Sequence, residues 1–411
     1  CPTLKGMTNN RILTPDLARG SALLGIAVAN AVTVWTTNIN HPMPGHIGII
    51  AHDSLWDKIA IMIGAIFVHV RGLPMFATLL GYGVGMILVR EQRNGSRYKR
   101  VLTRRYATLA LIGVLHMIFL FYGDIMLTYA LMALTIVPLA KFKDKTLIIV
   151  TCVLYLASTA FFLHSILSPT GEDRANPYGH GYFVDQLGPG TFLVQATPIM
   201  YLLDIITVLP MVLVGFIAGR RGILENPEPY RRLMRWCAGL AVVVSLGLGI
   251  PLGLASIGVI GGEPAWFTLN QLVGQLVGLG MIAWVFYIAQ WLQRRGWDHT
   301  LPVRMLVALG RMSMTGYVLQ SVLFIALVVP WGFLGLGSGS GAAAAMSVGA
   351  GVWLLTLIFA YTWSRTVSKR GPLETLHRRI GYSKTSRAAI LPAAEQNPPT
   401  EGTQFLTGAT S

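Results

Sequence analysis

The sequence predicts an all-α polytopic integral membrane protein with about ten transmembrane helices and both termini in the cytoplasm. Hydrophobic residues make up 53% of the 411 residues, charged residues only 12%, and the mean hydropathy is +0.58. Soluble domains carry roughly twice this share of charge. Apolar runs close to the roughly 20 residues that cross a bilayer recur along the chain. Because these runs are continuous rather than alternating, they favour helices over a membrane barrel.

A hydropathy window places the predicted spans along most of the chain. They cover approximately residues 17–36, 59–89, 104–122, 124–140, 146–166, 193–219, 236–258, 266–292, 302–329 and 342–363. The second run is too long for one straight crossing. We expect Pro74 to kink it, because proline removes a backbone donor inside a helix; a steep tilt is the alternative.

The positive charges identify the cytoplasmic side. The formal net charge is +15, but Lys and Arg gather in alternate loops, as the positive-inside rule requires. The predicted cytoplasmic segments are 1–16, 90–105, 141–145, 220–235, 293–304 and the C-terminal tail. The charge therefore indicates membrane topology and not nucleic-acid binding, and membrane lipids are the expected surroundings.

The chain is expected to form one membrane domain, residues 17–380, in the plasma (inner) membrane. A cytoplasmic segment, 1–16, precedes it, and a polar tail, 381–411, is predicted to be disordered because it has no apolar period. The histidines of the loop 37–58 lack the paired spacing of a zinc site, so no metal is predicted. The sequence leaves a homo-oligomer open.

The first span carries polar residues along much of its length. Asp16 and Arg19 are one helical turn apart, and Arg19 and Asn30 fall on nearly the same line of a helix. Polar groups cost free energy in hydrocarbon, so this face should point to a bundle interior or a wet cavity. The structural alternative for Asp16 is a helix N-cap, and for Arg19 it is a side chain that extends to the membrane interface. For Asn30 we favour a functional role or a specific interhelical bond.

Two residues able to exchange protons lie near the external end of the third span. His116 is in its outward half, and Asp124 follows Gly123, which is expected to end the helix. A histidine titrates near neutral pH and can act as a base. The alternative is a histidine satisfied by a neighbouring helix, with Asp124 as a helix cap.

Other polar residues interrupt the apolar runs. Arg71 in the second span needs a carboxylate or an anionic ligand, and Asp204 and Asp124 are the possible partners. In the ninth span Gln320 shares one face with Ser313 and Tyr317, and Arg311 lies at the cytoplasmic end. Small residues at 81, 85, 310 and 316, all glycines, are typical of close helix contacts.

Taken together, these motifs resemble the YeiB-like membrane proteins. The resemblance covers nearly all of the chain except the tail and the external loops. The motifs that carry it are Asp16-x-x-Arg19-Gly20, Gly25, Asn30, Phe76, Gly81-Tyr82-Gly83, Leu115-His116, Tyr122-Gly123-Asp124-Ile125, Tyr129-Ala130, Gly310-Arg311, Thr315-x-Tyr317-x-x-Gln320-Ser321, Trp363 and Gly371-Pro372-Leu373-Glu374. The family's activity is poorly defined, so the resemblance implies a fold more than a reaction.

The YeiB-like proteins are related to a transmembrane acyltransferase superfamily that includes the heparan-glucosaminide acetyltransferases. Those enzymes pass an acetyl group from cytoplasmic acetyl-CoA to a sugar amine across the membrane. Their first-span pattern matches Asp16, Arg19 and Asn30 here, with a histidine at the position of His41. The YeiB-like pattern itself fits His116 better, so either histidine is a candidate base.

The resemblance implies an acyltransferase that moves an acetyl group from acyl-CoA to an envelope glycan or lipid. His41 or His116 would be the base, Asn30 would orient it or polarise the acyl carbonyl, and Asp124 would orient His116 or bind the acceptor. Basic residues of 90–105 would bind the phosphates of CoA. The alternative is a transporter or lipid-handling protein, with Arg71, Asp204, His116 and Asp124 along an intramembrane pathway; a scaffold is the third possibility.

Overall fold

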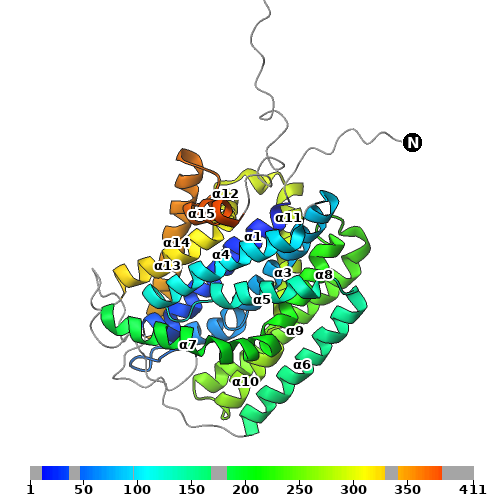
Figure 1. Cartoon of the computed structure of the whole chain (residues 1–411). Coiled ribbons are helices and arrows are strands. Elements are labelled where there is room, and N and C mark those ends of the chain that lie inside the picture. Colours follow the sequence, from blue (N-terminus) through cyan, green and yellow to red (C-terminus); the bar gives the residue numbers. More distant parts are fainter. Residues whose placement is uncertain (1–11, 37–46, 96, 168–182, 329–340, 382–411) are drawn as a thin grey trace, which may run out of the picture.

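The computed structural model describes residues 12–36, 47–95, 97–167, 183–328 and 341–381, which form an all-α bundle (Figure 1). His41 and nearly all of the predicted tail lie outside these residues. The α-helices are α1 (Leu13–Asn30), α2 (Leu55–Ile63), α3 (Gly72–Arg93), α4 (Tyr98–Phe119), α5 (Met126–Leu139), α6 (Asp144–Leu167), α7 (Phe183–Thr207), α8 (Leu209–Arg221), α9 (Arg231–Ser256), α10 (Glu263–Gly274), α11 (Val277–Arg294), α12 (Leu301–Arg311), α13 (Ser313–Leu327), α14 (Ala342–Thr366) and α15 (Pro372–Gly381). Two π-helical turns, η1 (Ala31–Trp35) and η2 (Gly64–Val68), extend α1 and α2.

The chain is a multi-pass membrane protein by the length and composition of its helices. Among the described residues, 7 helical segments are long and apolar enough to cross a membrane, and the bent pair α10–α11 makes up to 8. Two further predicted spans correspond to the shorter apolar helices α5 and α13. The predicted sixth span, 193–219, is instead divided between α7 and α8 at Val208, where Pro210 cannot donate to the preceding turn.

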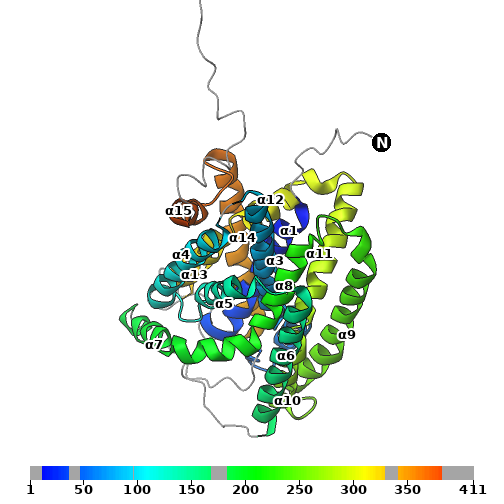
Figure 2. The same ribbon diagram turned by 45° about the vertical axis from the view of Figure 1, so that its right-hand side comes forward.

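The first span lies at the centre of the bundle. In the most apolar stretch of this span, 56% of the residues are buried inside the protein, whereas in the corresponding stretch of α7 only 6% are buried. Helix α1 packs on α3, α11, α12 and α14, and both views show it surrounded by other helices, while α7 crosses one end of the bundle (Figures 1 and 2). A polar face on α1 therefore points into protein, as the sequence indicates.

The second span breaks just before Pro74, and Arg71 satisfies the break. Residues 69–71 form a turn between η2 and α3, and Val70 has a positive φ of 55°, which is strained for a β-branched residue. Pro74 has no N–H to offer the carbonyl of Val70, and Arg71 Nη1 donates to that oxygen instead, at 3.3 Å. The break expected at the proline is present, three residues earlier along the chain.

Helices α3 and α8 pack with their backbones in contact through four glycines. A Cβ atom added at Gly81 or Gly85 would overlap the backbone of α8, and one added at Gly215 or Gly219 would overlap the backbone of α3. Small residues at a four-residue spacing permit this approach. The expectation that Gly81 and Gly85 serve helix packing is confirmed.

Replacing Gly81 by Ala is expected to destabilise the bundle by about 1–3 kcal/mol, because the new methyl group must push α3 and α8 apart. Gly83→Ala is the matched control, since its nearest contact would be Arg19 Nη2 at 3.7 Å. Thermal unfolding in detergent should show a lower transition for Gly81→Ala and an unchanged one for Gly83→Ala. Equal transitions would mean that α3 and α8 are not held at this distance.

Candidate functional site

Two adjoining cavities lie within the described part of the bundle. The first, here the arginine cavity, has a volume of about 300 Å³ and is lined by residues that include Arg19, Arg105 and Arg311. The second, here the amide cavity, has a volume of about 450 Å³ and includes Asn30, Gln271 and Gln275 in its wall. Cavities of this size commonly hold small ligands.

One face of α1 lines both cavities. Arg19 and Leu23 border the arginine cavity, Asn30 and Thr33 border the amide cavity, and Ile26 borders both. The spacings of three and four residues place these side chains on one stripe of a helix. The near alignment of Arg19 and Asn30 in the sequence therefore corresponds to one wall that passes from the first cavity to the second.

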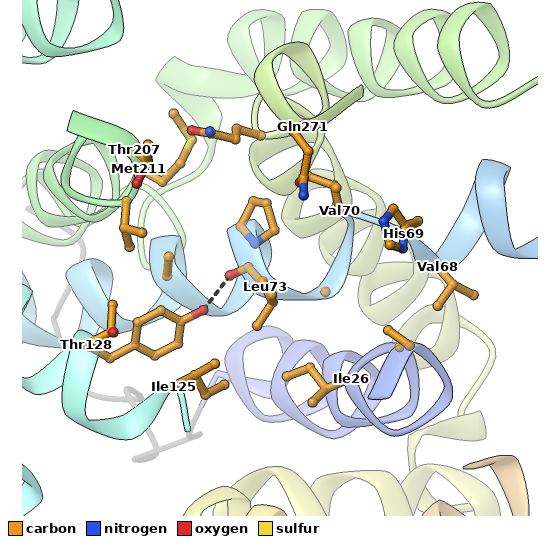
Figure 3. A pocket seen from close by; sticks show the side chains of 18 of the residues that line it. Ile26, Val68, His69, Val70, Leu73, Ile125, Thr128, Thr207, Met211 and Gln271 are labelled. Carbon is orange, nitrogen blue, oxygen red and sulfur yellow. Dashed lines mark hydrogen bonds between the residues drawn. The ribbon is translucent and has the colours of Figure 1, made fainter. Parts of the chain in front are cut away.

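Three residues separate the two cavities. Ile26, Ile125 and Tyr129 line both of them, and we call these three the shared wall. The Tyr129 hydroxyl donates to the carbonyl of Leu73 at 2.8 Å, drawn as a dashed line in Figure 3, and its ring stacks on Phe76 with 6.2 Å between centroids. The hydrogen bond fixes the tyrosine across the boundary between α3 and α5.

The arginine cavity is electropositive. Arg19, Arg105 and Arg311 line it together with one acidic residue, Glu374. Asp16 lies behind the wall: its carboxylate accepts from Arg311 Nε at 3.2 Å and is 3.8 Å from Arg19 Nη1. Asp16 is 2% exposed, so it orients the two arginines from behind. Guanidinium groups arranged in this way suit phosphate or carboxylate ligands.

Helix α15 closes one side of the arginine cavity. The carboxylate of Glu374 accepts from the N–H of Met314 at 2.8 Å, and from the N–H and hydroxyl of Thr315 at 3.1 and 2.5 Å. A carboxylate is favoured there, at the N-terminus of α13, although burial raises the pKa of Glu374. His377 Nε2 is 2.7 Å from the carbonyl of Arg105. Burial, followed by the charge of Arg105, lowers the pKa of His377 to about 4.

The contribution of His377 to the docking of α15 is expected to weaken as the pH falls from about 6.5, the ordinary histidine pKa, toward the docked pKa of about 4. Between these values undocked His377 binds more protons than docked His377, so this residue favours release in acid, whereas Glu374, whose pKa is raised on burial, favours docking. The His377 contribution should appear in hydrogen exchange of residues 372–381, corrected for its intrinsic pH dependence, as a larger rise toward pH 5 than in a protein without this titration. The control His377→Asn keeps Glu374 but lacks this titration, so its exchange should respond less; an identical response in both proteins would contradict the assignment.

The amide cavity is built where helices are interrupted. His69 and Val70 come from the break before α3, Val208 from the break between α7 and α8, and Gln275 from the break between α10 and α11. That last pair is bent by 57°. Irregular backbone at membrane depth is tolerated where it lines a cavity, and interrupted helices commonly mark binding sites in membrane proteins.

Arg71 contacts neither of its two predicted acidic partners. Its guanidinium donates to Asn270 Oδ1 at 2.9 Å and to backbone carbonyls around the break in the second span. Asp204 instead accepts from Thr128 at 3.0 Å, and Asp124 binds His116. Arg71 is 1% exposed and lies behind the amide cavity wall, so its first role in this structure is to hold the interrupted helices together.

His116 is held on both sides. Its Nδ1 is 2.8 Å from Asp124 Oδ1, and its Nε2 is 2.9 Å from Ser321 Oγ. The other oxygen of Asp124 accepts from the N–H of Leu127 at 2.7 Å, in the first turn of α5. The hydrogen-bonded series Ser321–His116–Asp124 has the connectivity of a nucleophile–base–acid triad. None of the three lines the arginine or the amide cavity, and together they join α4, α5 and α13.

The predicted site residues thus fall into three places. Arg19 and Arg311 line the arginine cavity, and Asn30 and Asp204 line the amide cavity. Asp16, Arg71, His116, Asp124 and Gln320 lie behind these walls in hydrogen-bonded positions; Gln320 Nε2 donates to the carbonyl of Leu23 at 3.2 Å.

Four further residues of the cavity walls, Tyr129, Gln275, Glu374 and His377, were not among the predicted site residues. Tyr129 and Glu374 appear in the sequence only as parts of family motifs, and Gln275 looks like an ordinary member of an apolar segment. The signal that distinguishes them is their position at a helix break or between two cavities, which a single sequence does not display.

Comparison with known proteins gives one family model and relatives that align over most of the chain. Residues 218–384 match the family model described as "Protein of unknown function (DUF418)". The chain is 26% identical over 410 residues to the uncharacterized protein YxaH of Bacillus subtilis (strain 168), covering 93% of this chain and 96% of that protein. It is 26% identical over 412 residues to the uncharacterized protein YeiB of Escherichia coli (strain K12), covering 92% and 100%.

The chain is therefore similar to the YeiB-like proteins over nearly its whole length, and its C-terminal part matches the DUF418 family model. The resemblance inferred from the motifs is confirmed. The matched region runs from the end of α8 through α15, and supplies Gln275, Arg311 and Glu374. The cavity walls on α1 and α3–α7 precede the matched region, but the two relatives align over nearly the whole chain.

Proposed function

We propose that this protein is a transmembrane acyltransferase that moves an acyl group, in the first instance acetyl, from cytoplasmic acyl-CoA to an envelope glycan or lipid. The observation that carries the proposal is the shared wall: two cavities of different chemistry meet at Ile26, Ile125 and Tyr129. An acyl group small enough to pass these side chains could leave one bound molecule and join another without either crossing the membrane.

The proposal includes the topology that the charge pattern predicts. With about ten spans and both termini in the cytoplasm, the end of the bundle that holds Arg105 and α15 faces the cytoplasm. The arginine cavity then faces the compartment that contains acyl-CoA, and the amide cavity lies toward the outside. The basic segment 90–105, which ends at Arg105, supports this orientation.

Each cavity has a chemical role in the transfer. Arg19, Arg105 and Arg311 bind anionic groups of the donor, and the thioester lies toward the shared wall. In the amide cavity Asn30 orients the acceptor or the base. The base removes a proton from the acceptor hydroxyl or amine, the acceptor forms a bond to the acyl carbon, and the CoA thiolate leaves and takes up a proton.

The two candidate bases are His116 and His41, which lies outside the described residues. Both ring nitrogens of His116 already have partners, Asp124 and Ser321. We therefore assign the proton transfer to His41 and a positioning role to His116.

The test is acyl transfer by purified protein in nanodiscs, with labelled acetyl-CoA and a cell-envelope extract. We expect labelled acceptor and released CoA. Arg311→Gln should raise KM for the donor, whereas His41→Ala and Asn30→Ala should lower kcat. Absence of both transfer and a CoA-dependent shift in melting temperature would overturn the proposal.

Transport is the second candidate, favoured by the interrupted helices around the amide cavity. In transporters such breaks bind the substrate at membrane depth. Counterflow of a solute in liposomes that depends on Asp204 and occurs without acyl-CoA would favour transport. Transfer of label without solute movement would favour the enzyme.

A further inference from the structure

We propose that the amide cavity binds an uncharged polyhydroxyl group, such as a sugar ring or a polyol headgroup, with Gln275 and Asp204 as its principal hydrogen-bond acceptors. Naming this ligand the acyl acceptor rests on the proposed function; the binding itself does not.

The first observation is an unsatisfied acceptor in the cavity wall. Gln275 is 8% exposed and lines the amide cavity, and its Oε1 is buried without a hydrogen-bond partner among the described residues. A buried acceptor that lacks a donor costs about 1–3 kcal/mol. Gln275 lies in the two-residue break between α10 and α11, so the unsatisfied oxygen is at an interrupted helix and not inside a packed one.

The second observation is that the hydroxyl groups of the wall already donate to the protein. Thr33 donates to the carbonyl of Ala29 at 2.8 Å, and Thr207 to that of Leu203 at 2.9 Å. Thr128 donates to Asp204, and Tyr129 to a backbone carbonyl. A hydroxyl has a single proton to donate. These oxygens therefore offer lone pairs to the cavity, as the Gln275 oxygen and the Asp204 carboxylate do, and the matching ligand is rich in donors.

The third observation concerns charge. Asp204 is the one carboxylate and no Lys or Arg lines the cavity among the described residues. The Arg71 guanidinium lies directly behind the wall, close enough to Gly274 that a Cβ there would be 2.7 Å from its Nη1. The Asp204 carboxylate in the wall disfavours a carboxylate ligand, and the Arg71 guanidinium behind the wall disfavours an ammonium ligand. Hydroxyl groups supply donors without charge.

The rest of the wall is apolar, which a sugar ring also suits. Pro74, Leu73, Phe162 and Met211 line the same cavity, and Figure 3 shows Leu73, Met211 and Gln271 around one space. The C–H face of a ring packs on such side chains while its hydroxyls bond to the polar ones. The volume of about 450 Å³ is that of a small-ligand pocket.

The experiment compares three sugars of one shape and different charge, with no acyl-CoA present. Binding of methyl glucoside, glucosamine and glucuronate to nanodisc-bound protein is measured at pH 7. We expect methyl glucoside to bind at least about tenfold more tightly than either charged sugar. Tighter binding of glucosamine or glucuronate, or no binding of methyl glucoside, would overturn the proposal, and these outcomes need no variant.

Gln275→Met tests the named acceptor, because it keeps the length of the side chain and removes its oxygen. We expect methyl glucoside to bind about tenfold more weakly, and Gln293→Met, the same change at an exposed position of α11, to leave binding unchanged. Unaltered binding by Gln275→Met would overturn the assignment. Because acyl transfer is not measured, failure of the proposed reaction would leave this result standing, and the reverse also holds.

Discussion

Replacing His116 by Ala is expected to lower the free energy of unfolding by about 3–5 kcal/mol, because truncating a buried side chain leaves a cavity and leaves an Asp124 oxygen without its hydrogen-bond partner. The Asp124 side chain is 0% exposed and that of His116 2% exposed. Without the imidazole, one carboxylate oxygen loses its partner in a region that water does not reach. The Leu127 N–H still donates to the other oxygen of Asp124, so the first turn of α5 keeps this hydrogen bond.

Ser321→Ala is the graded control for this prediction. It removes a neutral hydroxyl from the other ring nitrogen of His116 and is expected to cost about 1 kcal/mol. Thermal unfolding of the two variants in the same detergent gives the comparison. Equal destabilisation would show that His116 and Asp124 do not form the buried pair described here, and loss of transfer without loss of stability would return His116 to the list of candidate bases.

Replacing Ile26 by Trp is expected to reduce acyl transfer at least about 100-fold while both ligands still bind. Ile26 borders both cavities, and the larger side chain would fill the passage between them. A displacement of about 1 Å between reacting groups is enough to cost a factor of this size. Transfer is measured with labelled acetyl-CoA, and donor binding by its effect on melting temperature.

Ile26→Val is the control, since it keeps a β-branched side chain and removes one methyl group. Its transfer should remain within a few-fold of the original protein, and its cost in stability should be about 0.5–1.5 kcal/mol. If Ile26→Trp folds and transfers at the original rate, the acyl group does not pass the shared wall.

The sequence predicts the parts of this architecture that depend on local patterns. Apolar runs locate the membrane helices, Pro74 marks the broken second span, and the spacing of Arg19 and Asn30 indicates one polar face of α1. These inferences need only the period of a helix and the cost of polar groups in hydrocarbon. The division of the predicted sixth span at Val208 departs from them, because hydropathy does not detect a change of direction between two apolar helices.

The partners of the polar residues could not be predicted. His116 meets Ser321 across 205 positions of sequence, and Glu374 caps α13 across 59. Arg71 is satisfied by carbonyls that only the broken helix exposes. Such contacts depend on which helices become neighbours, and the residue types alone allow many pairings.

The central claim is that an acyl group crosses between two cavities while its donor and acceptor stay on opposite sides. Sided transfer in sealed proteoliposomes tests it most directly, with labelled acetyl-CoA on one side and envelope extract enclosed on the other. Labelled acceptor is expected only where acetyl-CoA faces the end of the protein that holds Arg105 and α15, with no acetyl-CoA entering the vesicles. Transfer that requires both substrates on one side, or intact acetyl-CoA inside the vesicles, would contradict it.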